Sequence, residues 1–344
     1  MENNIRKKIL ITDPTLRDGS HANQHQFSEK QIRSYSIAAE RARIPILEVG
    51  HGNGIGASSL QVGLSSVNDL DMIRFAREHL QNTKLGIFMI PGFATIKKDL
   101  RPAIDAGADV VRIASHCTEA DITERHIGYA RERGKLTHGC LMSSHMASAE
   151  TLIEECKKME SYGAEGVILM DSAGNYLPSD VYEKVSALVK NIHIPIGFHA
   201  HNNLSMAVAN SVAAVEAGAL IVDGTSRGFG AGAGNTPIEV LVAVLEKMGY
   251  DTGIDLYKIL DASEIADKDI LNSKPTIDST SIVSGLAGVF SAFKKHVIRV
   301  SAEYNVDSRD VFFELGRRKV VGGQEDLIVE IAIELSSKEK SLRI

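Results

Sequence analysis

The sequence is poor in cysteine, in long apolar runs and in clustered basic residues. It has three cysteines among 344 residues, Cys117, Cys140 and Cys156, and no two of them form a CxxC pair. An odd number of dispersed cysteines argues against a disulfide framework of the kind that stabilises small secreted proteins. We therefore expect three reduced thiols and a cytoplasmic location.

Signals for a membrane or for nucleic acid are also missing. The first apolar run, residues 9–11, is far too short for the core of a signal peptide or for a membrane span. The formal net charge is −6, from 38 basic and 44 acidic residues, and the basic residues are scattered among acids without forming a stripe. We expect neither a membrane nor a nucleic-acid partner.

What the sequence does contain is a regular alternation of short apolar runs with stretches of helical periodicity. Helical patterns occupy, for example, residues 28–43, 148–162 and 204–217. The expected strands are 8–12, 46–50, 85–90, 110–114, 137–142, 167–170, 195–199 and 220–223. Eight strand–helix units predict an α/β fold, a TIM (β/α)8 barrel. A doubly wound sheet is the alternative, because strand runs alone do not reveal whether a sheet closes.

Beyond residue 253 the pattern changes to helices without strands between them. The expected helical runs are 255–269, 282–300, 308–315 and 324–335. A polar stretch at 272–275 (NSKP) is the expected connection. We predict a barrel domain over residues 1–265 and a helical C-terminal extension over residues 266–344.

The segment 199–203 (HAHNN) at the end of the seventh expected strand is the sharpest local signal. Alternate residues of a strand point to the same side, so His199 and His201 would both project inward at the barrel mouth. The alternative for such a pair is two hydrogen-bonded polar histidines. Asp18, at the end of the first strand, would add a carboxylate, and two nitrogens with one carboxylate and open positions are typical of catalytic metal sites. The three residues predict a site for a divalent cation, and Mn²⁺, Co²⁺, Fe²⁺, Zn²⁺ and Mg²⁺ all suit it.

Neighbouring residues supply candidates for the chemistry around such a cation. Arg17 could stabilise an oxyanion, or it could simply pair with a nearby carboxylate. His21 is a candidate general base, because imidazole titrates near neutrality, although a loop histidine is often merely exposed. The glycine-rich segment 228–235 (GFGAGAGN) could cradle an anion at a helix N-terminus, or its glycines could allow close packing of loop against helix. It lacks the lysine of a phosphate-binding loop.

Taken together, these motifs resemble the 4-hydroxy-2-oxovalerate aldolase family of the DRE-TIM metallolyases, and the resemblance spans essentially the whole chain. The motifs are TLRDGSH at 15–21, HG at 51–52, HCTEAD at 116–121, SYGA at 161–164, HAHNN at 199–203, GAGAGN at 230–235, GRR at 316–318 and VGGQED at 321–326. The resemblance implies retro-aldol cleavage of a 4-hydroxy-2-oxo acid to pyruvate and an aldehyde.

The resemblance also assigns roles to individual residues. It implies that Asp18, His199 and His201 hold Mn²⁺, and that pyruvate or its enolate chelates this ion. It implies that Arg17 stabilises the developing enolate and that His21 accepts the proton of the C4 hydroxyl. These roles agree with general chemistry, since cations act where negative charge develops and a base acts where a proton leaves.

Further implications concern the substrate pocket and the partner. Ser172 matches the family's substrate-contacting serine. The family usually carries tyrosine in the motif AGVYS, whereas residues 287–291 read AGVFS, so Phe290 keeps the ring and loses the hydroxyl. The released aldehyde and the stereochemistry at C4 therefore do not follow from the resemblance. Family members pass the aldehyde through a channel to a CoA-acylating aldehyde dehydrogenase, which implies a heterotetramer of two chains of each kind.

Two rival hypotheses remain. The first is an acyl-CoA Claisen-type synthase or lyase of the same superfamily. Against it, Gly19 stands where the synthases carry glutamate, and the lyase's loop cysteine is absent from residues 228–235. The second is a non-catalytic partner subunit of an aldehyde dehydrogenase, and the joint presence of Arg17, Asp18, His21 and the histidine pair counts against it.

Overall fold

The eight apolar runs form a closed barrel in a computed structural model that describes residues 6–270 and 274–342. Each strand pairs in parallel with its neighbours in sequence, and the first pairs with the last. The strands are β1 (Leu10–Leu16), β2 (Ile46–Val49), β3 (Lys84–Met89), β4 (Val110–His116), β5 (Leu136–Met142), β6 (Val167–Asp171), β7 (Ile196–Ala200) and β8 (Ile221–Asp223). The prediction of a TIM barrel is confirmed, and the doubly wound sheet is excluded.

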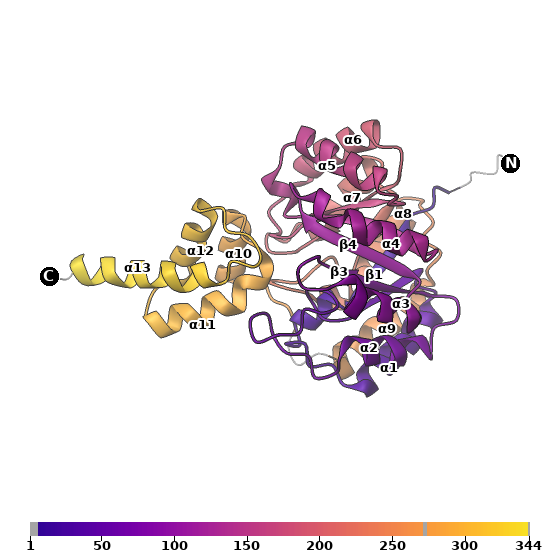
Figure 1. Cartoon of the computed structure of the whole chain (residues 1–344), viewed down its shortest axis with the longest axis horizontal. Coiled ribbons are helices and arrows are strands. Elements are labelled where there is room, and N and C mark those ends of the chain that lie inside the picture. The colour runs from indigo at the N-terminus through magenta and orange to yellow at the C-terminus, as the bar shows by residue number, and fades with distance from the viewer. Residues whose placement is uncertain (1–5, 271–273, 343–344) are drawn as a thin grey trace.

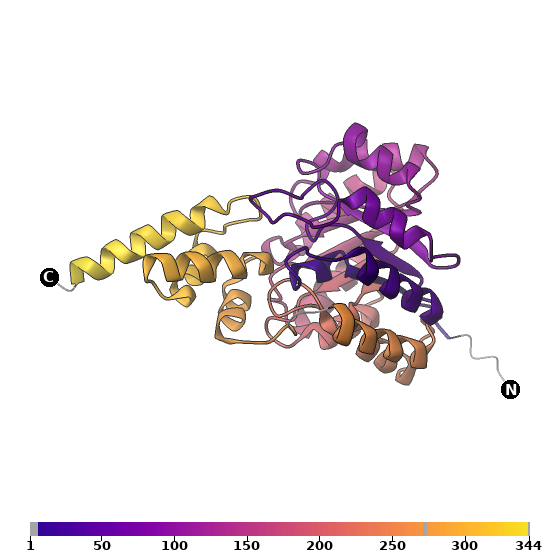
Figure 2. The same cartoon turned by 90° about the horizontal axis from the view of Figure 1, so that it is seen from below.

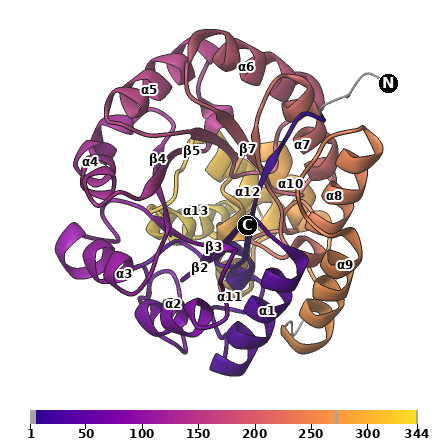
Figure 3. The same ribbon diagram turned by 90° about the vertical axis from the view of Figure 1, so that its right-hand side faces the viewer.

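Helices surround the strands as a ring, which is clearest when the barrel is viewed along its axis (Figure 3). They are α1 (Glu29–Ala42), α2 (Asp69–Arg77), α3 (Arg101–Asp105), α4 (Glu124–Glu132), α5 (Ala149–Ser161), α6 (Pro178–Asn191), α7 (Ala207–Glu216), α8 (Ile238–Lys247) and α9 (Leu256–Ile265). Four of them, α1, α2, α5 and α9, begin at a side-chain cap. In α1, Ser28 and Gln31 form a capping box. The strands are buried on both faces, as expected for parallel strands between a barrel interior and a helical ring. The three cysteines are free and buried.

The first strand is longer than its apolar run. It extends from Leu10 to Leu16 and includes Asp13 and Thr15, which the sequence placed after the strand. Both polar side chains are buried and satisfied, because Asp13 accepts hydrogen bonds from Thr15 and from the hydroxyl of Tyr35. The extension places Arg17 and Asp18 at the mouth of the barrel, since they follow directly after the strand.

A second group of helices projects from the end of the barrel at which the strands terminate (Figures 1 and 2). It comprises α10 (Ser279–Ala287), α11 (Lys294–Tyr304), α12 (Ser308–Arg317) and α13 (Asp326–Leu342). These helices share an apolar core of their own, centred on Phe293, Val297, Phe312 and Ile331. Helix α9, in contrast, packs against α1 and α8 as part of the barrel's ring.

The prediction of one continuous helix over residues 282–300 is wrong. Helix α10 ends at Ala287 because Gly288 adopts a left-handed conformation, with φ of +66°, and caps it. A short 3-10 turn, η7 (Ser291–Phe293), then leads into α11. The break turns the chain back toward the barrel mouth and brings Phe290 to it.

The break is fixed to the barrel by two hydrogen bonds to backbone carbonyls. The amide of Ser291 donates to the carbonyl of Ser172 over 2.9 Å, and Nε2 of His145 lies 2.9 Å from the carbonyl of Gly288. The predicted connection at 272–275 lies partly outside the described residues, because 271–273 are not described. In the described parts of the chain, no helix has both the length and the apolar composition needed to cross a membrane.

Candidate metal centre

Asp18, His199 and His201 converge at the mouth of the barrel. One ligand atom from each residue lies within 4.8 Å of the other two, and all three side chains are buried. Asp18 follows β1, His199 lies near the end of β7, and His201 comes directly after that strand. The two imidazole rings are 5.1 Å apart between centroids, as expected for residues two apart on one face of a strand.

The donor atoms of this group are suited to a cation. Within residues 6–270 and 274–342, nothing hydrogen-bonds to Nε2 of His199 or to Nδ1 of His201, although both nitrogens are buried. Buried polar atoms are normally paired, so two unpaired ring nitrogens beside a carboxylate are suited to binding a cation. Burial lowers the pKa of His201 to about 4, so its ring is neutral near pH 7, as metal ligation requires.

The balance of buried charge points the same way. The candidate ligand Asp18 belongs to a connected group of buried charges. The group holds two guanidinium groups and three carboxylates: those of Arg17, Arg112, Asp18, Glu48 and Asp223. With all five ionised, the cluster carries one net negative charge in a site shielded from water. A buried uncompensated charge is costly, and a divalent cation would offset it.

The carboxylate of Asp18 is held from two sides. Nη1 of Arg17 donates to its Oδ1 over 3.0 Å, and the side-chain amide of Asn235 donates to its Oδ2. Burial alone would raise the pKa of Asp18, but the charge of Arg17 and the imidazoles of His201 and His21 lower it well below its usual value. Asp18 is therefore ionised throughout the physiological range.

Arg17 is oriented by contacts on both sides of its guanidinium. Its Nε donates to Glu48 over 2.5 Å, and its Cζ lies 4.3 Å from the ring centroid of Phe88. Its remaining nitrogen, Nη2, is buried and has no hydrogen-bond partner among the residues that the structure describes. An unpaired cationic donor next to a candidate metal site is suited to an oxyanion. The pairing of Arg17 with carboxylates is thus observed, and the stabilisation of an oxyanion by its unpaired donor stays a prediction.

His21 lies beside the same group. Its Nε2 is 4.0 Å from Oδ1 of Asp18, and its side chain is only 12% exposed. Burial lowers the pKa of His21 to about 3, so the ring is neutral and able to accept a proton near pH 7. The alternative of an exposed loop histidine is therefore wrong.

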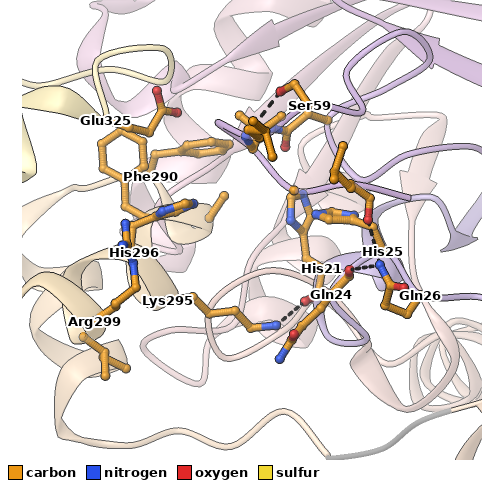
Figure 4. A pocket seen from close by; sticks show the side chains of 18 residues that line it. His21, Gln24, His25, Gln26, Ser59, Phe290, Lys295, His296, Arg299 and Glu325 are labelled. Carbon is orange, nitrogen blue, oxygen red and sulfur yellow. Dashed lines mark hydrogen bonds between the residues drawn. The ribbon is translucent and has the colours of Figure 1, made fainter. Parts of the chain in front are cut away.

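Phe290 reaches the mouth from the C-terminal helices and forms a wall between two cavities. The first has a volume of about 700 Å³ and is also lined by His21, and Figure 4 shows Phe290 and His21 on opposite sides of it. The second, of about 440 Å³, is lined by Ser143 and Met142 of the barrel. Ser172 lies beneath this region, with its hydroxyl accepting a hydrogen bond from the amide of Ser143 over 2.9 Å.

The glycine-rich segment 228–235 is closely packed. A Cβ on Gly232 would lie 2.6 Å from Oδ1 of Asn203, and one on Gly230 would lie 2.5 Å from Oδ1 of Asn235. These contacts favour the packing interpretation of the glycines over an anion cradle. The segment serves the site by bringing Asn235 against Asp18.

Sequence reasoning missed four residues that organise the site: Glu48, Arg112, Asp223 and Asn235. Three of them carried a visible signal, because Glu48, Arg112 and Asp223 are charged residues within otherwise apolar strands. A charge inside a buried strand has to find a partner, and here the partners are one another and the site residues. Asn235 ends the glycine-rich segment 228–235, but nothing in that pattern indicated a contact with Asp18.

Comparisons with known proteins agree with this geometry. An HMGL-like family model matches residues 8–266, and a DmpG-like communication domain matches residues 275–337. A 4-hydroxy-2-oxovalerate aldolase from Spirochaeta aurantia is 60% identical over 98% of this chain and 99% of its own length. A second, from Pectobacterium atrosepticum, is 58% identical over 98% of each chain.

Solved structures agree on the fold. The carboxyl transferase domain of pyruvate carboxylase from Rhizobium etli matches with a TM-score of 0.80 at 17% identity, over 97% of this chain and 61% of that one. This likeness concerns the fold alone. The buried Asp–His–His group, the closed barrel and the near-full-length identity lead to one conclusion: the chain belongs to the HMGL-like family and, within it, to the 4-hydroxy-2-oxovalerate aldolases.

Proposed function

We propose that this chain is a divalent-metal-dependent aldolase that reversibly cleaves 4-hydroxy-2-oxovalerate, or a related 4-hydroxy-2-oxo acid, to pyruvate and an aldehyde. The observation that carries the proposal is the buried group of Asp18, His199 and His201, in which both histidines have an unpaired ring nitrogen. These three residues would hold the cation, and we favour Mn²⁺ because the family resemblance implies it, although the nitrogen and oxygen donors suit several divalent ions. When bound, a divalent cation supplies Lewis acidity for the carboxylate and keto oxygens of the oxo acid.

The residues around the ligands have complementary roles. His21, neutral because it is buried, accepts the proton of the C4 hydroxyl as the C3–C4 bond breaks and the aldehyde departs. The electron pair of that bond moves onto the pyruvate half, whose keto oxygen gains negative charge. Arg17 offers its unpaired Nη2 to this charge, and its orientation is already fixed by Glu48. Protonation at C3 then yields pyruvate.

Two further residues shape the substrate pocket in this proposal. Ser172 contributes a buried hydroxyl at the end of β6. Phe290 provides an apolar wall opposite His21, where the aldehyde half of the substrate would lie (Figure 4). Because phenylalanine cannot donate a hydrogen bond, the hydroxyl at C4 has to be oriented by other groups, among them His21.

The test is a metal titration combined with a pyruvate assay. Apoprotein, prepared with a chelator, should recover activity with Mn²⁺ in a 1:1 ratio and release pyruvate from hydroxy-oxo acids of increasing chain length. Release of one aldehyde per pyruvate checks the stoichiometry. The proposal is wrong if no such acid is cleaved with any of Mn²⁺, Co²⁺, Mg²⁺ or Zn²⁺, or if a CoA ester is consumed without release of pyruvate.

We also propose that the helices α10–α13 bind a CoA-acylating aldehyde dehydrogenase, in a heterotetramer with two chains of each kind. The match of residues 275–337 to a communication domain supports this. The separate core of these helices supports a C-terminal unit distinct from the barrel, and we propose residues 1–265 and 266–344 as the two domains. A cytoplasmic location would place the two enzymes together. Co-expression with such a dehydrogenase, followed by sedimentation analysis, should show one complex of that composition, and two independently sedimenting species would contradict the pairing.

A further inference from the structure

Arg112 lies inside the barrel, in the middle of β4, and its side chain is completely inaccessible to solvent. Its Nη1 donates to Oε2 of Glu48 over 3.0 Å, and its Nη2 donates to Oδ2 of Asp223 over 2.7 Å. Glu48 belongs to β2 and Asp223 to β8, so one guanidinium bridges carboxylates from two strands that lie on either side of β1.

Each of these carboxylates has a second partner at the proposed active site. The other oxygen of Glu48, Oε1, accepts from Nε of Arg17 over 2.5 Å. Oδ2 of Asp223, the same atom that Arg112 contacts, lies 2.9 Å from Nδ1 of His199. An unbroken series of ionic hydrogen bonds therefore runs from His199 through Asp223, Arg112 and Glu48 to Arg17.

The residues at the two ends of this series, His199 and Arg17, can serve the site only if their side chains are correctly oriented. Since a carboxylate can only accept, Asp223 requires the proton of His199 to reside on Nδ1, which leaves the lone pair of Nε2 for a cation. Glu48 holds Nε of Arg17 and so fixes the plane of the guanidinium that carries the unpaired Nη2. Because Arg112 sets the positions of both carboxylates, a displacement of its guanidinium would disturb the cation ligand and the oxyanion donor together.

We propose that Arg112 is a positioning residue that couples the cation-binding half of the site, through Asp223 and His199, to the oxyanion-stabilising half, through Glu48 and Arg17. The inference rests on the proposed function. A purely structural role explains these charges poorly, because well-packed apolar residues of similar volume usually stabilise a protein interior at least as well as a buried ion pair. The barrel interior next to this cluster is in fact apolar, with Ala114, Cys140 and Ile168.

The test uses Arg112→Lys, which keeps the charge but cannot donate to both carboxylates in fixed directions. Apoprotein of the variant should bind Mn²⁺ with a dissociation constant raised by about tenfold to 100-fold, measured by calorimetric titration. At saturating Mn²⁺, kcat should fall by at least about tenfold while KM stays within a few-fold, because the oxyanion donor acts mainly in the transition state. Arg131→Lys is the control, because Arg131 also donates to a carboxylate, that of Glu165, but lies outside the barrel.

Each outcome decides between the two proposals. If the wild-type protein neither binds Mn²⁺ nor releases pyruvate, the proposed function fails. If the wild-type protein does both, and folded Arg112→Lys matches it within twofold in Mn²⁺ affinity and kcat, the coupling role of Arg112 is overturned. A lower melting temperature with unchanged Mn²⁺ affinity and kcat would likewise reduce Arg112 to a structural residue.

Should Arg112→Lys fail to fold, a double-mutant cycle on the flanking carboxylates decides the question. Glu48→Gln and Asp223→Asn keep the shape of each side chain and remove its charge. If Arg112 couples them, the increase in the Mn²⁺ dissociation constant of the double variant should differ by more than about threefold from the product of the two single increases. If the increase in the dissociation constant of the double variant agrees within twofold with the product of the two single increases, the coupling is contradicted.

Discussion

His21 and Asp18 face each other at the barrel mouth, with Nε2 of the imidazole 4.0 Å from Oδ1 of the carboxylate. The two residues are three apart in sequence, on the short 3-10 turn that follows β1. A candidate base thus lies next to a candidate cation ligand. A substrate held by the cation would have its C4 hydroxyl within reach of His21, which is the geometric condition for general base catalysis.

Replacing His21 by glutamine should separate proton transfer from cation binding. We expect His21→Gln to lower kcat by about 10²- to 10⁴-fold, the usual contribution of a general base, and to leave Mn²⁺ affinity within a few-fold. Steady-state kinetics and calorimetric titration measure the two effects. His126→Gln, on the outer helix α4, is the control. A kcat for His21→Gln within threefold of wild type would remove His21 from the mechanism.

Removing a ligand should abolish cation binding itself. His201→Ala leaves two of the three ligands, and we expect purified protein to contain less than about a tenth of the wild-type Mn²⁺ at matched concentrations, with activity lost in parallel. Metal content by mass spectrometry and thermal melting with and without Mn²⁺ both report this. Wild-type protein should gain thermal stability on adding Mn²⁺, whereas the variant should not. A stoichiometric ion in His201→Ala would mean that the site lies elsewhere.

Arg17→Lys tests the oxyanion donor. Lysine keeps the charge but cannot hold Glu48, Asp18 and a substrate oxygen with one planar group. We expect kcat to fall by about 10²- to 10³-fold, as for the loss of a single oxyanion donor, with a smaller change in KM. Arg33→Lys, on the outer face of α1, should behave as wild type. A purely electrostatic role would instead leave kcat nearly intact in Arg17→Lys.

Phe290→Tyr should change selectivity more than rate. The added hydroxyl would lie in the cavity that Phe290 shares with His21, where it could bond the C4 hydroxyl of one enantiomer better than that of the other (Figure 4). We expect the ratio of kcat/KM for the two C4 enantiomers to shift by about tenfold, measured with resolved substrates. Phe313→Tyr, half-exposed on α12, is the control. An unchanged ratio would show that residue 290 does not contact the C4 hydroxyl.

Acid should destabilise the fold partly through His138. Burial inside the barrel lowers its pKa from 6.5 to about 3. Below pH 6.5 the unfolded chain binds a proton at this residue that the folded chain does not, so the free energy of unfolding falls as pH falls. The contribution is about 1.4 kcal/mol per pH unit between pH 6 and pH 4. Urea unfolding at several pH values should show a shallower dependence in His138→Gln, and an identical slope would contradict a neutral buried ring.

Much of this arrangement could be predicted from local sequence patterns. The alternation of apolar runs and helical stretches predicted all eight strands, because a short run of apolar residues bounded by polar or glycine-rich sequence indicates a buried strand. The inward direction of His199 and His201 followed from their spacing on one strand. Gly288 could also have been recognised as a helix end, since its left-handed conformation is one that glycine favours.

What only the tertiary structure decided are the contacts between distant strands. Glu48, Arg112 and Asp223 belong to strands β2, β4 and β8, and which charge meets which depends on the closure and stagger of the barrel. The position of Phe290 opposite His21 depends on how α10 and α11 pack against the mouth, across more than half of the chain. The sequence by itself thus determined the strands and the ligand residues, because both follow from patterns among neighbouring residues, whereas the charge network and the cavity walls arise from long-range packing.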